Sequence, residues 1–258
     1  MRHLLLIFAI SILFLLPIVE PEIKIDKALR PPNAENPFGT DQLGRDILAR
    51  ILLALRLDLV LGALVVVISS SIGILLGLLA SHFSTVDKLV IFITDVFLAL
   101  PELVFALVLV GILGPGIESA VIALTAFGWM RYSRTVRGIG LFLKESGFVE
   151  LLKAIGASDS RIIFRHVFPN TLPRIIPLFA YHYGHAIVSF AALSFLGLGA
   201  QPPVAELGAM LSEGKNYMFS APWLVFFPTT VIVIVVAILT FLGNRLEANF
   251  SPRRVSRW

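Results

Sequence analysis

The stretch "GFVELLKAIGASDSRIIFRHVFPNTLP" (Gly147–Pro173) separates two long apolar runs of the chain. Its first half predicts a short amphipathic helix, because its apolar residues share one face at helical spacing. Gly156 is expected to end that helix with a positive φ. Ser158 or Asp159 then predicts the cap of a second short helix. Pro169 and Pro173 are expected to redirect the chain into the next apolar run. The residues expected in the apolar stripe of the first helix are Phe148, Leu151, Leu152 and Ile155.

Two interpretations of this segment stay open at this point. An amphipathic helix with basic residues can rest on anionic lipid at the membrane surface. The same segment can instead hold a soluble partner against the membrane face.

The composition of the chain indicates an integral membrane protein. Of its 258 residues, 57% are hydrophobic and only 15% are charged, whereas soluble domains carry about a quarter charged residues. There is no cysteine, which excludes disulfides and cysteine chemistry. We therefore expect an all-α, polytopic membrane protein.

Six apolar runs predict about six transmembrane helices, since a span needs about 20 mostly apolar residues. The first run, Leu4–Pro17, is short, and a cleaved signal peptide is its alternative interpretation. We favour its retention, because no small-residue cleavage motif precedes Glu20. The other five predicted spans are Leu59–Ala80, Leu89–Leu113, a return beginning with Ile117–Met130, Thr171–Leu196 and Ala221–Gly243.

The loop charges predict an orientation. Residues 131–174 contain eight Lys or Arg and three acids, whereas residues 194–222 contain one Lys and two acids. Because cytoplasmic loops collect Lys and Arg, the segment Gly147–Pro173 is expected in the cytoplasm. With six spans, both termini are then cytoplasmic, and residues 21–58 and 194–222 face outward.

Three separated sequence blocks resemble one family of membrane proteins. Glu150, Gly156 and Pro169 match the EAA loop of ATP-binding-cassette (ABC) importer permeases, although Leu151 and Leu152 stand where that loop usually has alanines. "NPFGTDQLGRDILARILLALR" (Asn36–Arg56) and "LSFLGLGAQPP" (Leu193–Pro203) resemble the dipeptide/oligopeptide/nickel group, specifically its second, C-type permease subunit.

This resemblance implies a type I ABC importer permease fold with a cytoplasmic coupling helix, in a bacterial cytoplasmic membrane. The implied partners are a second, homologous permease subunit, two ATP-binding subunits, an extracytoplasmic solute-binding protein and membrane lipid, with no nucleic acid. ATP and Mg would be used by the partner ATPases, and no cofactor is expected on this chain. The implied division is a first span (1–20), an external segment (21–58) and a permease core (59–258) that contains the coupling loop (147–170).

The motifs that would indicate an ATPase or a hydrolase are absent, which supports the interpretation as a permease subunit. No G-x-x-x-x-G-K-[ST] phosphate loop occurs, and neither H-E-x-x-H nor G-x-S-x-G occurs. We therefore expect no enzymatic activity and no catalytic residues. An ion-coupled secondary transporter with an interfacial basic loop, or a scaffold for a membrane complex, are the alternatives from other classes.

The candidate functional residues fall into three groups. The coupling loop is expected to act on the ATPase through Glu150, Gly156, Ala157, Asp159, Arg161 and Arg165. Asp41, Arg45 and Asp46 are expected to pair with one another and fix the external segment, without ligand contact. Asp95 and Glu102, near the ends of a span, are expected to be hydrated or paired, because lone charges are costly there.

His182 and His185 are candidates for the translocation path. They lie three residues apart, on neighbouring positions of one helix face. Imidazole suits nickel or copper, so this pair favours nickel or a metal chelate as cargo over a dipeptide or oligopeptide, which is the alternative within the family. A structural role for both histidines is equally compatible with the sequence. Two histidines do not define a metal site, and the metal ligands are left unassigned.

Overall fold

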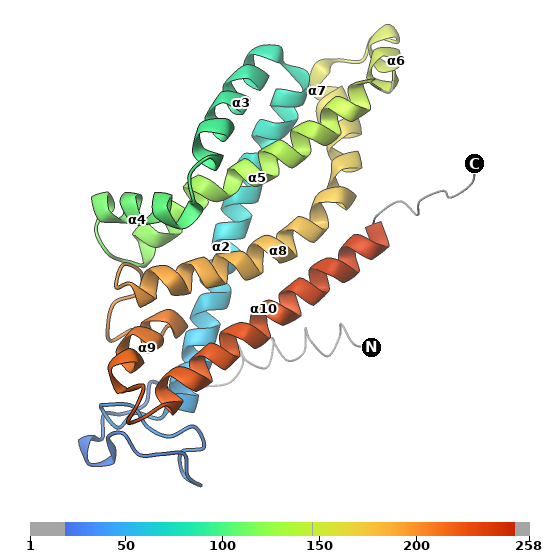
Figure 1. Cartoon of the computed structure of the whole chain (residues 1–258). Helices are drawn as coiled ribbons and strands as arrows, with labels where there is room; N and C mark the ends of the chain where they lie inside the picture. Colours follow the sequence, from blue (N-terminus) through green and yellow to red (C-terminus); the bar gives the residue numbers. More distant parts are fainter. Residues whose placement is uncertain (1–18, 146, 251–258) are drawn as a thin grey trace. The chain divides into compact units, whose positions relative to one another are not determined.

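The computed structural model describes residues 19–145 and 147–250, and within them every regular element is helical (Figure 1). The predicted first span, Leu4–Pro17, and the last arginines of the tail lie outside the described residues. The elements are η1 (Ile25–Lys27), α2 (Ile47–His82), α3 (Ser84–Leu98), α4 (Glu102–Leu113), α5 (Ile117–Glu145), α6 (Phe148–Ala154), α7 (Asp159–Arg161), η2 (Ile162–Val167), α8 (Phe168–Phe195), α9 (Leu207–Gly214), η3 (Lys215–Tyr217) and α10 (Trp223–Phe250). The all-α expectation is therefore confirmed for this part of the chain.

Three of the described helices are long and apolar enough to cross a membrane: Ile47–His82, Asp159–Phe195 and Trp223–Asn249. A fourth span results if α3 and α4, which are bent by 92° at their junction, count as one. α5, expected to begin the return span, is not among these helices. Its second half carries Arg131, Arg134 and Arg137 on consecutive helical turns.

The predicted span Leu89–Leu113 is not one straight helix, because the chain bends between α3 and α4 (Figure 1). Proline has no N–H to donate to the preceding turn and disfavours helical φ/ψ in the residue before it. Pro101 therefore ends α3 and starts α4, whose first turn is closed by the Phe105 N–H donating to the Pro101 carbonyl at 3.1 Å.

The predicted separate second helix of Gly147–Pro173 is also wrong. α7 continues through a π-helical turn, η2, directly into α8, and α8 runs on through Pro173 and Pro177. Two side chains near the start of α8 add hydrogen bonds to backbone carbonyls of the preceding turn. Asn170 Nδ2 donates to the carbonyl of His166, and Thr171 Oγ1 donates to that of Phe168, both at 2.7 Å.

The described chain forms two compact units. The first comprises residues up to 62, 110–120 and 187–235. The second comprises residues 63–109, 121–186 and 236 onward.

The first unit is organised around the start of α2, which begins at Ile47, twelve residues before the predicted span Leu59–Ala80. Ile47, Ile51 and Ala54 are almost fully buried against residues of α9 and the start of α10. Gly39 and Gly44, with φ of 78° and 73°, make the turns that lead into α2, as expected for glycines there.

In the second unit, α2 and α5 approach closely through small residues. A Cβ on Gly73 would lie 2.3 Å from the Trp129 carbonyl oxygen, and one on Gly77 would lie 2.7 Å from that of Ser133. Small residues four apart are the usual device for close helix contact in membranes. This contact fixes one face of α5 against α2 and leaves its opposite face for other neighbours.

Candidate functional site

The segment 147–170 begins at Gly147, whose φ of 73° turns the chain from α5 into α6. Val149 and Leu152 of α6 are buried in a cluster with Val136 and Ile162. The predicted apolar stripe is therefore wrong in its register, because Leu151 and Ile155 are 64% and 73% exposed. Burial against α5 and η2 selects the i, i+3 pair that reaches this cluster and leaves two large apolar side chains on the surface.

Gly156 ends α6 with a φ of 82°, as predicted. The Gly156 N–H donates to the Lys153 carbonyl at 2.9 Å, and the Ala157 N–H donates to the Leu152 carbonyl at 3.0 Å. These bonds satisfy carbonyls that the end of a helix leaves open. Ala157 is half-buried and packs against the same apolar cluster as Leu152.

Ser158 is the N-cap residue of α7, but neither it nor Asp159 makes a side-chain capping hydrogen bond. The Asp159 carboxylate instead lies 2.7 Å from His82 Nε2, at the end of α2, and 4.0 Å from Lys153 Nζ. Asp159 therefore links segment 147–170 to α2, a contact that the sequence did not indicate.

The surface of this segment is basic and partly apolar. Glu150, Arg161 and Arg165 are exposed, and Phe164 is 54% exposed. A shallow hollow of about 590 Å³ is lined by Ser158, Ser160, Arg161, Phe164, Arg165 and Pro169. Such a surface can accept an apolar side chain next to a carboxylate of a partner.

The two histidines predicted for the translocation path lie in different surroundings. His182 is buried, and its Nδ1 lies 3.1 Å from the Tyr132 hydroxyl. A Cβ on Gly128 would lie 2.9 Å from Nε2 of His182, so the other edge of the ring is enclosed as well. His182 therefore has the surroundings of a structural residue.

His185 has a half-exposed side chain, and its Nδ1 lies 3.6 Å from Oε1 of Glu102 at the start of α4. Arg131 of α5 makes an ion pair with the same carboxylate. Asp95 likewise pairs with Arg134, so both span carboxylates are paired, as expected. Among the described residues, no group of three His, Cys, Asp or Glu could hold a metal ion.

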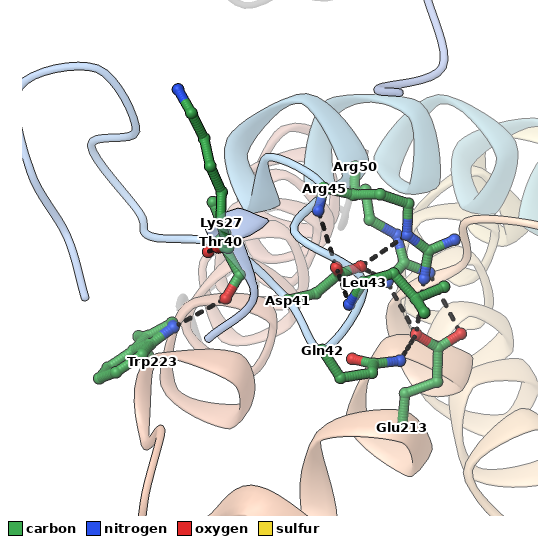
Figure 2. Close-up of polar contacts among 9 residues, drawn as sticks. All are labelled: Lys27, Thr40, Asp41, Gln42, Leu43, Arg45, Arg50, Glu213 and Trp223. Atoms are coloured by element: carbon green, nitrogen blue, oxygen red, sulfur yellow. Dashed lines mark hydrogen bonds and ion pairs between the residues drawn. The ribbon is translucent and has the colours of Figure 1, made fainter. Parts of the chain in front are cut away.

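In the first unit, a buried ion cluster joins the segment before α2 to α9 (Figure 2). Asp41 accepts from Arg45 Nε and from Arg50 Nη1, both at 2.7 Å. Arg50 Nη1 also lies 2.7 Å from Glu213, whose carboxylate accepts from Gln42 at 3.0 Å. The predicted Asp41–Arg45 pair is confirmed. Arg50 and Glu213 were missed, because the contact spans 163 residues of sequence.

Asp46 does not join this cluster. Its carboxylate accepts from Asn36 Nδ2 at 2.6 Å and from the Ala49 N–H at 2.8 Å. Asp46 therefore caps the start of α2, a common role for aspartate immediately before a helix.

Burial and charge act in opposite directions on two carboxyl groups of α9. Burial raises the pKa of Glu213, but the hydrogen bonds and charge of Arg50 outweigh it and leave that pKa below its usual range. Burial raises the pKa of Glu206 above its usual value, although its carboxylate accepts from the Gly208 and Ala209 N–H groups. Asp58 of α2 hydrogen-bonds to Glu206 and accepts from the Leu207 N–H at 3.3 Å.

The apolar helices, their close packing through small residues and the basic surface segment together indicate a helical membrane protein. Comparison with known proteins identifies its family. Residues 69–256 match the model of the binding-protein-dependent transport system inner membrane component. The chain belongs to this family, whose members are permease subunits of ABC transporters and not enzymes.

Similar curated proteins cover most of the chain. It is 38% identical over 229 residues to the glutathione transport system permease protein GsiD of Pectobacterium atrosepticum, covering 88% of this chain and 76% of that protein. It is 40% identical over 229 residues to the dipeptide transport system permease protein DppC of Alkalihalophilus pseudofirmus, covering 88% and 75%.

The fold is similar to that of a solved importer. A chain from inward facing conformations of the MetNI methionine ABC transporter matches with a TM-score of 0.57 and 20% identity, over 78% of this chain and 94% of that one. The resemblance to ABC importer permeases is thereby confirmed for both family and fold.

Proposed function

We propose that this chain is one of two permease subunits of an importer for short peptides of dipeptide or glutathione size. The observation that carries this proposal is the similarity to permeases named for dipeptide and glutathione transport, over 88% of the chain. The buried position of His182 adds to it, because a histidine pair was the argument for nickel. The peptide alternative is therefore preferred over nickel or a metal chelate.

Segment 147–170 is proposed to be the coupling loop that docks on an ATP-binding partner. The exposed Leu151 and Ile155 support this role, since large apolar side chains on a surface helix favour a protein contact. The exposed Arg161 and Arg165 suit acidic groups on the same partner. Glu150, Gly156, Ala157 and Asp159 are proposed to shape the loop.

The proposed orientation follows the loop charges. Segment 147–170 and both termini are assigned to the cytoplasm, and residues 21–58 to the outside as an external segment before the permease core. ATP and Mg belong to two ATPase partners, because this chain has no phosphate-binding loop. A solute-binding protein delivers the cargo, and the ion-coupled alternative is disfavoured by membership of a binding-protein-dependent family.

The cargo is tested with the complete transporter in proteoliposomes, supplied with its binding protein and ATP. We expect uptake of radiolabelled glutathione or dialanine, and no uptake when ATP is omitted. Uptake of ⁶³Ni²⁺ without uptake of either peptide would overturn the peptide assignment and restore the nickel alternative.

A further inference from the structure

Three arginines form a row on one face of α5, and each pairs with a carboxylate of α3 or α4. Arg131, Arg134 and Arg137 follow one another at three-residue spacing, so they lie along one side of the helix. Their partners are Glu102, Asp95 and Asp87, respectively. We call these three ion pairs the α5 ladder. It contains three positive and three negative charges and is neutral as a whole.

The ladder lies within reach of the membrane interior. Arg131 is fourteen residues after the start of α5 at Ile117, which corresponds to about 21 Å of helix. The hydrocarbon core of a bilayer is about 30 Å thick. A bilayer that begins near the start of α5 therefore contains Arg131, whereas Arg137, about 30 Å from Ile117, lies at its far edge.

Three charged groups of the ladder are only partly covered by the chain itself, whereas Glu102 is 9% exposed and Arg137 and Asp87 are 25% and 23% exposed. The side chains of Arg134 and Asp95 are 48% and 56% exposed, and that of Arg131 is 34% exposed. Ionisable side chains in a membrane face the interior of a bundle or a water-filled cavity, because exposure to lipid is costly. The face of α5 that carries the ladder must therefore border water or protein.

A different face of α3 has the character of a lipid contact. Leu89, Phe92 and Val96, at helical spacing, are 59%, 67% and 50% exposed. Thus α3 presents exposed apolar side chains on one side and the acids of the ladder on another. This division separates the side that lipid can cover from the side that it cannot.

We propose that the α5 ladder forms part of the wall of the aqueous translocation path, and that its exposed pairs bind the charged ends of a peptide cargo. The second half of this inference rests on the proposed peptide function. A free peptide is a zwitterion, so its carboxylate suits Arg134 or Arg131 and its ammonium suits Asp95. The half-exposed His185 beside Glu102 extends the same polar wall.

The path assignment is tested by thiol labelling of the assembled transporter, because the chain has no cysteine of its own. Thr135 is exposed on α5, between Arg134 and Arg137 in sequence, and donates to the Arg131 carbonyl at 2.9 Å. Thr135→Cys is expected to react with a charged, water-soluble methanethiosulfonate. Phe92→Cys, from the apolar face of α3, is the matched control and is expected to react at least about tenfold more slowly, a difference of roughly 1.4 kcal/mol in barrier.

Two outcomes would overturn the path assignment. One is a Thr135→Cys thiol that is as unreactive as that of Phe92→Cys, which would place the ladder against lipid or buried protein. The other is a thiol that reacts in the isolated chain but not in the assembled transporter, which would place the ladder at the contact with the second permease.

Recognition of the charged ends is tested by protection of the same thiol. Saturating dialanine is expected to slow the labelling of Thr135→Cys during ATP turnover, whereas N-acetyl-dialanine amide, which lacks both charges, is not. Adding Arg134→Gln and Asp95→Asn should abolish this protection. Equal protection by both peptides, or by neither, would overturn zwitterion binding. Peptide uptake by the wild-type transporter is measured separately, so failure of the proposed cargo is distinguishable from failure of the ladder assignment.

Discussion

Single carboxyl groups of the first unit differ in the protonation state that the fold requires. Glu213 receives hydrogen bonds from Arg50 and Gln42, so the fold favours its charged form. Glu206 lies beside Asp58, and a hydrogen bond between two carboxyl groups requires one proton between them. The start of α9 is therefore stabilised by a proton shared between Asp58 and Glu206, whereas its end is stabilised by the negative charge of Glu213.

Replacing Asp58 with Asn should make the first unit less sensitive to alkaline pH. The two carboxyl groups share one proton, and burial raises the pKa of Glu206. The stability that this shared proton contributes is therefore fully present below the usual carboxyl pKa and is lost as pH rises through the raised value. In Asp58→Asn, the amide N–H₂ donates to Glu206 without a titratable proton, and the amide oxygen still accepts from the Leu207 N–H. We expect a gain of about 1 kcal/mol at pH 8 and a smaller gain at pH 5. Thermal unfolding of the purified transporter measures this, and a loss of stability at pH 8 would contradict the shared proton.

Replacing Glu213 with Gln should instead lower the stability of the first unit at neutral pH. The lowered pKa of Glu213 contributes stability above the usual carboxyl pKa, and this is lost as pH falls through the lowered value. Glu213→Gln removes the charge that Arg50 faces and should cost about 2 kcal/mol at pH 7. Glu35→Gln is the matched control, because Glu35 pairs with Lys27 at the surface and should show no measurable change. Amide exchange in α9 reports the loss, and equal exchange in both variants would refute the role of the cluster.

At the scale of elements, α6 and its C-terminal turn present the proposed contact with the ATPase. Gly156 has open space around its Cα, so a side chain there meets no neighbour, and only its φ of 82° opposes substitution. A change at this position therefore alters the end of α6 without disturbing the apolar cluster beneath it.

Comparing the variants Gly156→Val and Gly156→Asn separates the effect of backbone strain from the effect of side-chain size. Valine is strongly disfavoured at positive φ, at a cost of roughly 1–2 kcal/mol, whereas asparagine tolerates it. We expect Gly156→Val to reduce co-purification of the ATPase and uptake of cargo, and Gly156→Asn to retain most of both. Membrane insertion should be unchanged in each. Wild-type co-purification in Gly156→Val would reject the coupling role of this turn.

What the sequence predicted well at this scale rests on local rules. The positive φ of Gly156 follows from backbone sterics, so it could be predicted from the chain itself. The break at Pro101 follows from the same rules but was missed, because the apolar run continues on both sides of it. Which side of α6 is buried depends on the cluster beneath it and could not be read from α6 alone.

At the scale of the whole molecule, the partners in the long-range ion pairs could not be predicted from the sequence. The pairs of the α5 ladder join residues 29 to 50 positions apart, and the cluster at Asp41 reaches 163 positions along the chain. Charge type predicted that Asp95 and Glu102 would be hydrated or paired, but not that they pair with Arg134 and Arg131. Family membership, in contrast, was readable from three short blocks, because those residues are close in sequence.

The orientation of the whole chain is tested with single cysteines at two exposed positions. Ser158 lies in the proposed coupling loop, and Ser220 lies between α9 and α10. If cytoplasmic loops collect the basic residues, Ser158→Cys should be labelled by an impermeant maleimide only after the membrane is opened. Ser220→Cys should be labelled in intact cells. Labelling of both variants in denatured protein controls for expression. Labelling of Ser158→Cys in intact cells would reverse the orientation and remove the coupling loop from the side where ATP is hydrolysed.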